Sequence, residues 1–510
     1  MAQDKVNTIS AEVNRDEKEA FDLDQALSVA GLGIYNIKYT VVLSLFLIGA
    51  ILEPVGYAYI LPSSKCDLEM TDTIRGFVGS IPYIGIVITS FPWGYLVDTR
   101  GRKHTVIYSS LAAGILGIAS AFMPNLISFI ILKFLTSLCI ACPAAVPYTF
   151  VGELCPLKYR DIMLTLINAM QVSGAVLVPL FAWAILPLNF EANFGLYYFK
   201  PWRLLAIVYS SIFIIGGLLL INGPESPKYL MSQGRQEDTL QVLRTMYAQN
   251  KKKSPDEFPI KRLKYTEGAI NTKTSFLMSL KVQSVPLLKP PYVKWMALNS
   301  TLMFGIFATV NGLNMWLPEI LNRVFSGAGE GTACEVIAQG ANETVAEGEC
   351  IDTIDSLTFI INAAANCSVG VIAIITSVVI KYIGKKLLLV LVYCTIGVFC
   401  ILINFVSQQI LFAIFLSSIA LMGLAIAPVN AYSVQIFPTH LRGMAVGLSM
   451  MVGRAGSVVG SNVAGALLNS VCEATFYVFG GSLILCGLLS CFLPKSSSEQ
   501  DVKQRNITRL

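Results

Sequence analysis

Three ionisable residues lie inside stretches of sequence that are otherwise apolar: Glu53, Lys133 and Arg454. A charged side chain is costly in lipid and normally faces a charged partner or a water-filled cavity. Glu53 and Lys133 lie at similar depths in their segments at about 1.5 Å per helical residue, so we expect them to pair. Arg454 is the alternative partner of Glu53. Two roles stay open: a static salt bridge that lets two helices pack, or a Glu53 carboxylate that binds a proton or a cationic substrate group.

Uncharged polar side chains in other apolar stretches could contact a solute. Amides and hydroxyls at such positions also serve as hydrogen bonds between membrane helices, so both roles stay open. The candidate substrate contacts are Asn168, Gln171, Asn311, Asn314, Asn430 and Tyr432, with Trp316 as an aromatic wall.

Other chemistry finds little support in the sequence. His104 and His440 lack the spacing of a metal site, so we expect no metal. There is no phosphate-binding lysine loop of an ATP-driven pump and no nucleophile constellation. We therefore expect neither an enzyme nor a cofactor.

The elements that position these residues are membrane helices. Hydrophobic residues make up 54% of the 510 residues and charged residues 14%, which indicates a multi-pass membrane protein. A bilayer core takes about 20 helical residues. Twelve apolar segments have that length: 39–61, 76–97, 104–123, 126–150, 163–187, 203–222, 294–316, 357–380, 387–406, 409–430, 444–468 and 472–493.

The distribution of cations predicts the orientation. Nearly all of the 37 Lys and Arg fall in the tails and in every second loop, which places both termini in the cytosol. The net charge of +5 is therefore a topology signal, and we expect the partner to be the lipid bilayer, not nucleic acid. Residues 1–20 are polar, so we expect no cleavable signal peptide.

An internal repeat divides the chain into halves. The charged residues 97–103 align with 380–386 at an offset of 283, and residues 153–160 align with 435–442 at an offset of 282. Two motif pairs at nearly one offset predict parallel six-helix halves, as in one large class of secondary transporters. The expected divisions are a tail at 1–37, a half at 38–222, a linker at 223–293, a half at 294–493 and a tail at 494–510.

Residues 94–103 predict a tight, charged turn between two membrane helices. Gly101 suits backbone angles closed to other residues, and Gly94 would let its helix approach a neighbour closely. Asp98 could lie against the positive N-terminal end of another helix, while Arg102 and Lys103 pair with carboxylates.

These motifs resemble the major facilitator superfamily, and within it the synaptic vesicle glycoprotein 2 and organic-ion transporter branch. The superfamily pattern is Gly94-x-Leu96-x-Asp98-x-x-Gly101-Arg102-Lys103. A second motif, at residues 224–230, resembles the one that closes helix 6 in sugar porters and their organic-ion relatives, and residues 21–36 and 61–67 resemble the vesicle-glycoprotein branch. The chain departs from the pattern at Lys133, where arginine is usual, and at Lys381, where the first half has Asp98.

The resemblance implies an all-α fold of twelve transmembrane helices and a gating network on the cytosolic face. The expected gating residues are Asp98, Arg102, Glu153, Arg160, Glu225 and Arg442, with Gly94, Gly101 and Lys103 shaping the turn. The implied function is secondary transport of a small organic solute by alternating access, with proton coupling left open, by a monomer. The alternative is a transport-inactive vesicle or surface glycoprotein that acts in trafficking or as a receptor. A channel is a weaker third option.

Two further segments carry expectations. We expect a polar outward loop at 319–356, with a disulfide between Cys334 and Cys350 and glycosylation at Asn342, in a plasma or secretory-type vesicle membrane. Residues 22–30 place Leu23, Leu27 and Ala30 on one helical face, which predicts a short helix on the membrane surface.

Overall fold

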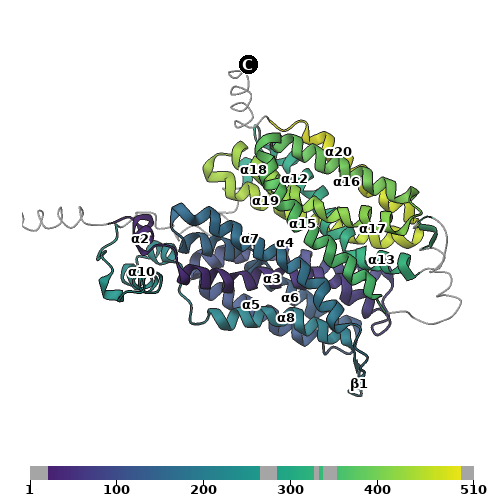
Figure 1. Cartoon of the computed structure of the whole chain (residues 1–510), viewed down its shortest axis with the longest axis horizontal. Coiled ribbons are helices and arrows are strands. Elements are labelled where there is room, and N and C mark those ends of the chain that lie inside the picture. Colours follow the sequence, from purple (N-terminus) through teal and green to yellow (C-terminus); the bar gives the residue numbers. More distant parts are fainter. Residues whose placement is uncertain (1–20, 265–283, 327–331, 333, 337–352, 495–510) are drawn as a thin grey trace, which may run out of the picture.

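The computed structural model describes residues 21–264, 284–326, 332, 334–336 and 353–494. Within these ranges 11 helices are long and apolar enough to cross a membrane by length and composition. Helix α5 (Arg102–Ser120) is the twelfth span, and its basic first turn lowers its mean hydropathy. The predicted all-α fold of twelve spans is confirmed. Figure 1 shows the spans as two bundles, one from each half of the chain.

The first bundle consists of regular helices. They are α3 (Ile34–Ser63), α4 (Asp72–Arg100), α5, α6 (Leu126–Leu154), α7 (Leu157–Ile185) and α8 (Pro201–Leu220). The second bundle contains two interrupted spans. Its seventh span runs through α12 (Val293–Phe307), η3 (Ala308–Leu313), η4 (Asn314–Trp316) and α13 (Leu317–Ser326). The remaining elements are α15 (Ser356–Ile383), α16 (Lys385–Leu402), η5 (Ile403–Phe405), α17 (Gln409–Ser417), η6 (Ser418–Ala425), α18 (Ile426–Ile436), α19 (Thr439–Ser470) and α20 (Cys472–Ser490).

Short elements mark the two ends of the bundles. One end, here the linker end, carries α2 (Leu23–Ala30), α9 (Pro227–Ser232), α10 (Gln236–Lys251), η1 (Pro255–Glu257) and η2 (Val285–Leu288). The opposite end, the hairpin end, carries the antiparallel strands β1 (Ala192–Asn193) and β2 (Tyr198–Phe199). Figure 1 places α2 and α10 far from β1 along the long axis.

The internal repeat is visible in the backbone. Gly101 separates α4 from α5 with a φ of 100°, and Gly384 separates α15 from α16 with a φ of 86°. Only glycine adopts such angles without strain, which is why each break is a single residue. The charged turn expected at residues 94–103 is therefore shorter than predicted, since α4 stays helical through Arg100.

The seventh span is longer than its apolar run predicts. Residues 319–326, expected as the start of a polar loop, belong to helix α13 (Leu317–Ser326). Glu319 and Arg323 both lie on this helix and form an ion pair across one turn. Because these charges are paired, the helix continues past the apolar residues.

The helix predicted to lie on the membrane surface packs on protein. Ala26, Leu27 and Ala30 of α2 are buried in one cluster with Leu243 and Met246 of α10. The expectation of a lipid-facing helix is therefore wrong, because the linker covers that apolar face. An isolated bridge between Phe21 and Leu263 also ties this segment to the linker.

The predicted disulfide between Cys334 and Cys350 is wrong, because Cys334 has a different partner. Cys334 is bonded to Cys472, 138 residues away, with the two Cα atoms 5.6 Å apart. Sequence spacing favoured the nearer cysteine, but the fold brings the first residue of α20 to the loop after α13. Cys66 is also disulfide-bonded. Cys350 and Asn342 lie outside the described residues, so the glycosylation stays a prediction.

We predict that Cys334→Ser lowers stability by about 2–4 kcal/mol, because the bond constrains the unfolded chain. The thermal midpoint of the purified protein measures this. Cys472→Ser and the double variant should match Cys334→Ser, since all three remove one bond. The exposed, free Cys367 offers the control Cys367→Ser, which should be neutral. A double variant markedly less stable than either single variant would contradict the pairing.

Candidate functional site

The two halves are joined at the hairpin end by four charged residues, here called the clasp: Asp72, Arg75, Glu319 and Arg323. Arg75, on α4, donates from Nη1 to Asp72 Oδ1 at 2.6 Å and to Glu319 Oε1 at 2.9 Å. Arg323, on α13, lies 3.1 Å from Asp72 Oδ2 and contacts Glu319. The clasp thus links α4 of the first half to α13 of the second through two acids and two bases.

The clasp lies in a buried setting. The Arg75 side chain is 2% exposed, and its guanidinium lies 5.0 Å from the ring centroid of Trp316. Nearby, α4 and α19 approach closely, because a Cβ built on Gly76 would lie 3.0 Å from the carbonyl oxygen of Ser461. Loss of one member of a buried ion pair leaves an uncompensated charge, which is strongly destabilising. The charges therefore favour contact between the halves at this end.

The linker end is different. A Cβ built on Gly94, Gly443 or Gly447 would meet no described atom within 4 Å. The Asp98 side chain is 57% exposed, and Tyr382 is 80% exposed. Figure 1 shows the bundles converging near α13 and diverging toward α2 and α10. The halves are thus in contact at the hairpin end and apart at the linker end. The expected close helix approach at Gly94 is wrong for this conformation.

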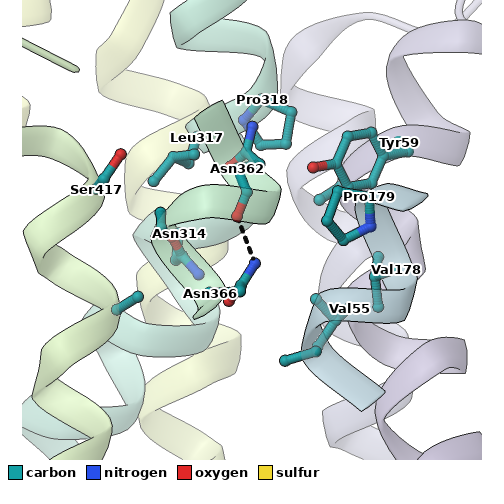
Figure 2. Close-up of a pocket in the computed structure, with 14 residues that line it drawn as sticks. Val55, Tyr59, Val178, Pro179, Asn314, Leu317, Pro318, Asn362, Asn366 and Ser417 are labelled. Atoms are coloured by element: carbon teal, nitrogen blue, oxygen red, sulfur yellow. Dashed lines mark hydrogen bonds between the residues drawn. The ribbon is translucent and has the colours of Figure 1, made fainter. Parts of the chain in front are cut away.

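A small cavity of 40 Å³ lies between the halves. Figure 2 shows its two unlike walls: Val55, Tyr59, Val178 and Pro179 come from the first half, and Asn314, Asn362, Asn366 and Ser417 from the second. A cavity of this volume holds water but no organic solute. It therefore marks a contracted, amide-lined end of the interface between the halves.

Two polar atoms on the second-half wall have no protein partner. They are Asn314 Oδ1 and Ser417 Oγ, both buried. Asn314 begins η4, and Ser417 ends α17 where η6 begins. Interrupted helix geometry of this kind recurs at functional positions. These unpaired atoms could accept or donate hydrogen bonds to water or to a solute.

Sequence reasoning found Asn314 but missed Asn362, Asn366 and Ser417. The signal was the spacing of the two asparagines, since residues four apart share a helix face. The structure shows this, because Asn366 Nδ2 donates to the Asn362 carbonyl oxygen at 3.0 Å.

The other uncharged candidates do not converge on this cavity. Asn168 and Gln171 both bond to the hydroxyl of Tyr148, Asn311 donates to Ser457 Oγ at 3.1 Å, and Asn430 contacts Met450 Sδ at 3.8 Å. Tyr432 is fully buried. Trp316 is 1% exposed and donates to the Ser461 carbonyl oxygen at 3.1 Å, so it packs beside the clasp and not as a cavity wall.

Glu53 and Lys133 form the expected pair. Lys133 Nζ lies 2.6 Å from Glu53 Oε1, and Ser210 Oγ donates to Glu53 Oε2 at 3.1 Å. The ammonium also lies 5.2 Å from the ring centroid of Tyr57. Both charged residues are 1% exposed, and neither lines the cavity. This pair is neutralised within the first half.

Arg454 does not reach Glu53, which excludes the alternative pairing. Its Nη1 instead donates to Ser90 Oγ of the first half at 3.1 Å. Within the described part of the chain, Arg454 forms no ion pair with a carboxylate. Its side chain is partly exposed although it lies midway along α19. The guanidinium therefore lies at the contact between α19 and α4, where it reaches the first half through Ser90.

The charged residues of the linker end form a network within the first half and the linker. Arg102 pairs with Asp98 and with Glu153, each at 3.2 Å, and Ser226 Oγ donates to Glu153 at 2.5 Å. Arg160 lies 3.3 Å from Asp24. On the second half, Arg442 donates to the carbonyl oxygen of Phe437 in its own turn.

Glu225, and not Asp98, lies at the N-terminal end of a helix. Asp98 was expected in such a position. Glu225 Oε1 accepts from the backbone N–H groups of Arg102 and Lys103, each at 3.0 Å. These N–H groups begin α5 and lack partners within the helix, which makes the position favourable for an anion. Asp98 remains exposed beside Arg102.

The chain is similar in sequence to known proteins. Synaptic vesicle glycoprotein 2A of Rattus norvegicus is 26% identical over 47% of the chain, but that match spans only 33% of the relative's length. The putative transporter svop-1 of Caenorhabditis elegans is 23% identical over 94% of the chain and 86% of the relative.

The fold resembles a solved transporter. The inward open conformation of the xylose transporter XylE from E. coli is 17% identical with a TM-score of 0.66, over 91% of this chain and 97% of that one. A family model described as the Major Facilitator Superfamily matches residues 34–334 and 352–508. Since that match covers most of the sequence, the chain belongs to the Major Facilitator Superfamily and has the fold of a secondary transporter.

Proposed function

We propose that this protein carries a small organic anion across the membrane by alternating access, with the linker end in the cytosol. The observation that supports an anionic solute is that Arg454 forms no ion pair with a carboxylate in the described part of the chain. An uncompensated guanidinium in the middle of a membrane helix carries a large desolvation cost. The Glu53–Lys133 pair shows that this chain neutralises its other deep charges with protein groups. Arg454 keeps its charge available to a solute.

The chemistry of Arg454 favours an acidic group. A guanidinium presents a planar set of donors that matches a carboxylate or phosphate in a bidentate contact. Ser90, which already accepts from Arg454, belongs to the other half. An anion bound between these two residues would contact both halves, so its binding could bias their relative position. The unpaired Asn314 and Ser417 atoms could receive uncharged parts of the solute when the cavity widens.

Alternating access assigns opposite roles to the two ends. Opening of the hairpin end requires that Arg75 leave Glu319 and that Arg323 leave Asp72. Closure of the linker end would bring the exposed Asp98, with Arg102 and Glu153, toward the second half near Arg442. We propose the clasp and this network as the two gates, each intact when the other is released.

The buried Glu53–Lys133 pair is better explained as structural than as a proton site. It lies within one half, is fully buried and does not reach the cavity. The trafficking alternative is less favoured, because a protein that only docked to others would have no need for an uncompensated Arg454.

We predict that Arg454→Gln lowers uptake of anionic solutes into proteoliposomes at least about tenfold, because a charge-assisted contact contributes about 1.5–3 kcal/mol. A panel of small mono- and dicarboxylates serves as the probe, and Arg454→Lys should retain part of the uptake. Arg244→Gln, on the surface of α10, is the matched control. If Arg454→Gln takes up carboxylates as fast as the parent protein, Arg454 is not part of an anion site.

We predict that Lys133→Met destabilises the protein by about 3–5 kcal/mol, because Glu53 is left buried without its cation. The double variant Glu53→Gln/Lys133→Met should recover most of that loss, and its uptake should keep the pH dependence of the parent. Thermal midpoints and uptake at several pH values measure both. Loss of pH dependence in a stable double variant would show that the pair carries a proton.

A further inference from the structure

The connection between α7 and α8 is an aromatic hairpin at the edge of the first half. Residues 187–200 contain the short strands β1 and β2, and Gly195 at the turn has a φ of 80°. Figure 1 shows β1 extending past the helices of the first bundle, on the side away from the second bundle. The tip of the hairpin therefore projects sideways from the protein, while its base lines a cavity with Thr353 and Ile354 of the second half.

The hairpin exposes large apolar side chains while its rings pack on each other. Phe194 lies 5.6 Å from Tyr197 and 6.2 Å from Phe199, measured between ring centroids. Phe194 is 61% exposed and Leu196 82% exposed. The hairpin contains two charged residues, Glu191 and Lys200, and both lie at its base. A contiguous apolar patch of this kind marks a surface that contacts something less polar than water.

The patch continues into the lipid-facing surface of the bundle. Phe199 lies 5.9 Å from Phe122, which follows α5 at the hairpin end. Phe122 is itself exposed, as are Ile127 at the start of α6 and Trp183 near the end of α7. Exposed apolar residues on membrane-spanning helices face lipid. The hairpin thus extends a surface whose occupant is the bilayer, at the level where aromatic side chains concentrate.

The base of the hairpin is held in place by a buried arginine. Arg203, at the start of α8, bonds to Asp67 at 2.8 Å and to the carbonyl oxygen of Ala121 at 2.9 Å. Its guanidinium lies 4.6 Å from the ring centroid of Tyr197. These contacts fix the hairpin relative to the first half.

We infer that the tip of this hairpin inserts into the lipid interface of the leaflet at the hairpin end. The tip carries no Lys or Arg, so its partner is a neutral or zwitterionic lipid surface, with insertion driven by apolar and aromatic side chains and not by anionic headgroups. Because Arg203 fixes the hairpin, the insertion anchors the first half at this leaflet. This insertion is independent of which solute the protein carries.

An environment-sensitive fluorophore on Leu196→Cys tests the insertion. The full chain, with the exposed cysteines replaced by Cys367→Ser and Cys491→Ser, is reconstituted in phosphatidylcholine nanodiscs. Lipids with a nitroxide near the headgroup should quench the Leu196 label at least about threefold more than a label on Asp355→Cys, an exposed charged position at the hairpin end of the second half. Aqueous iodide should show the reverse order.

Two further arms separate lipid from other partners. A label on Phe194→Cys repeats the measurement in case Leu196→Cys disturbs the turn. Quenching should be the same at low and high salt and with or without anionic lipid. If iodide quenches both hairpin labels as strongly as it quenches the label on Asp355→Cys, the hairpin tip lies in water and the inference is overturned. Lipid quenching that appears only with anionic lipid would overturn its neutral-lipid part.

Discussion

The conformation of this protein depends on four charges at one end of the interface between its halves. Asp72 and Arg75 begin α4, while Glu319 and Arg323 lie on α13. Their pairing lets the seventh span continue past its apolar residues and brings α4 against α19. We propose that it also sets which end of the protein is open, because the linker end has no comparable contact across the described parts of the two halves.

The deep charges of the chain behave differently according to their partners. Glu53 and Lys133 satisfy each other within one half, with Ser210 as a further donor, so that pair can remain buried in any relative position of the halves. Among the described residues Arg454 forms no ion pair with a carboxylate, and its guanidinium donates to the hydroxyl group of Ser90 in the opposite half. A charge whose partner lies across the moving interface is suited to respond to a solute. We therefore base the proposed anion site on Arg454.

Much of the fold could be predicted from the sequence, because helix length, charge placement and the repeat are local properties. Gly101 could be identified as a break, and the similar depths of Glu53 and Lys133 indicated that these two residues pair. The Cys334–Cys472 bond and the clasp could not be found in this way. They depend on how distant segments meet, and each involves residues that looked like loop or helix-end positions. The helix interruptions at η3 and η6 also escaped, since their apolar sequences match those of regular helices.

Distances measured between the two halves report whether the clasp keeps the hairpin end closed. Spin-label pairs at Leu188 and Asp355 report on the hairpin end, and pairs at Asp161 and Tyr382 report on the linker end, in protein carrying Cys367→Ser and Cys491→Ser. In Glu319→Gln the clasp loses its shared carboxylate charge. We expect the population with a longer hairpin-end distance and a shorter linker-end distance to rise. Distance distributions in a folded Glu319→Gln protein that match those of the parent at both ends would contradict the account.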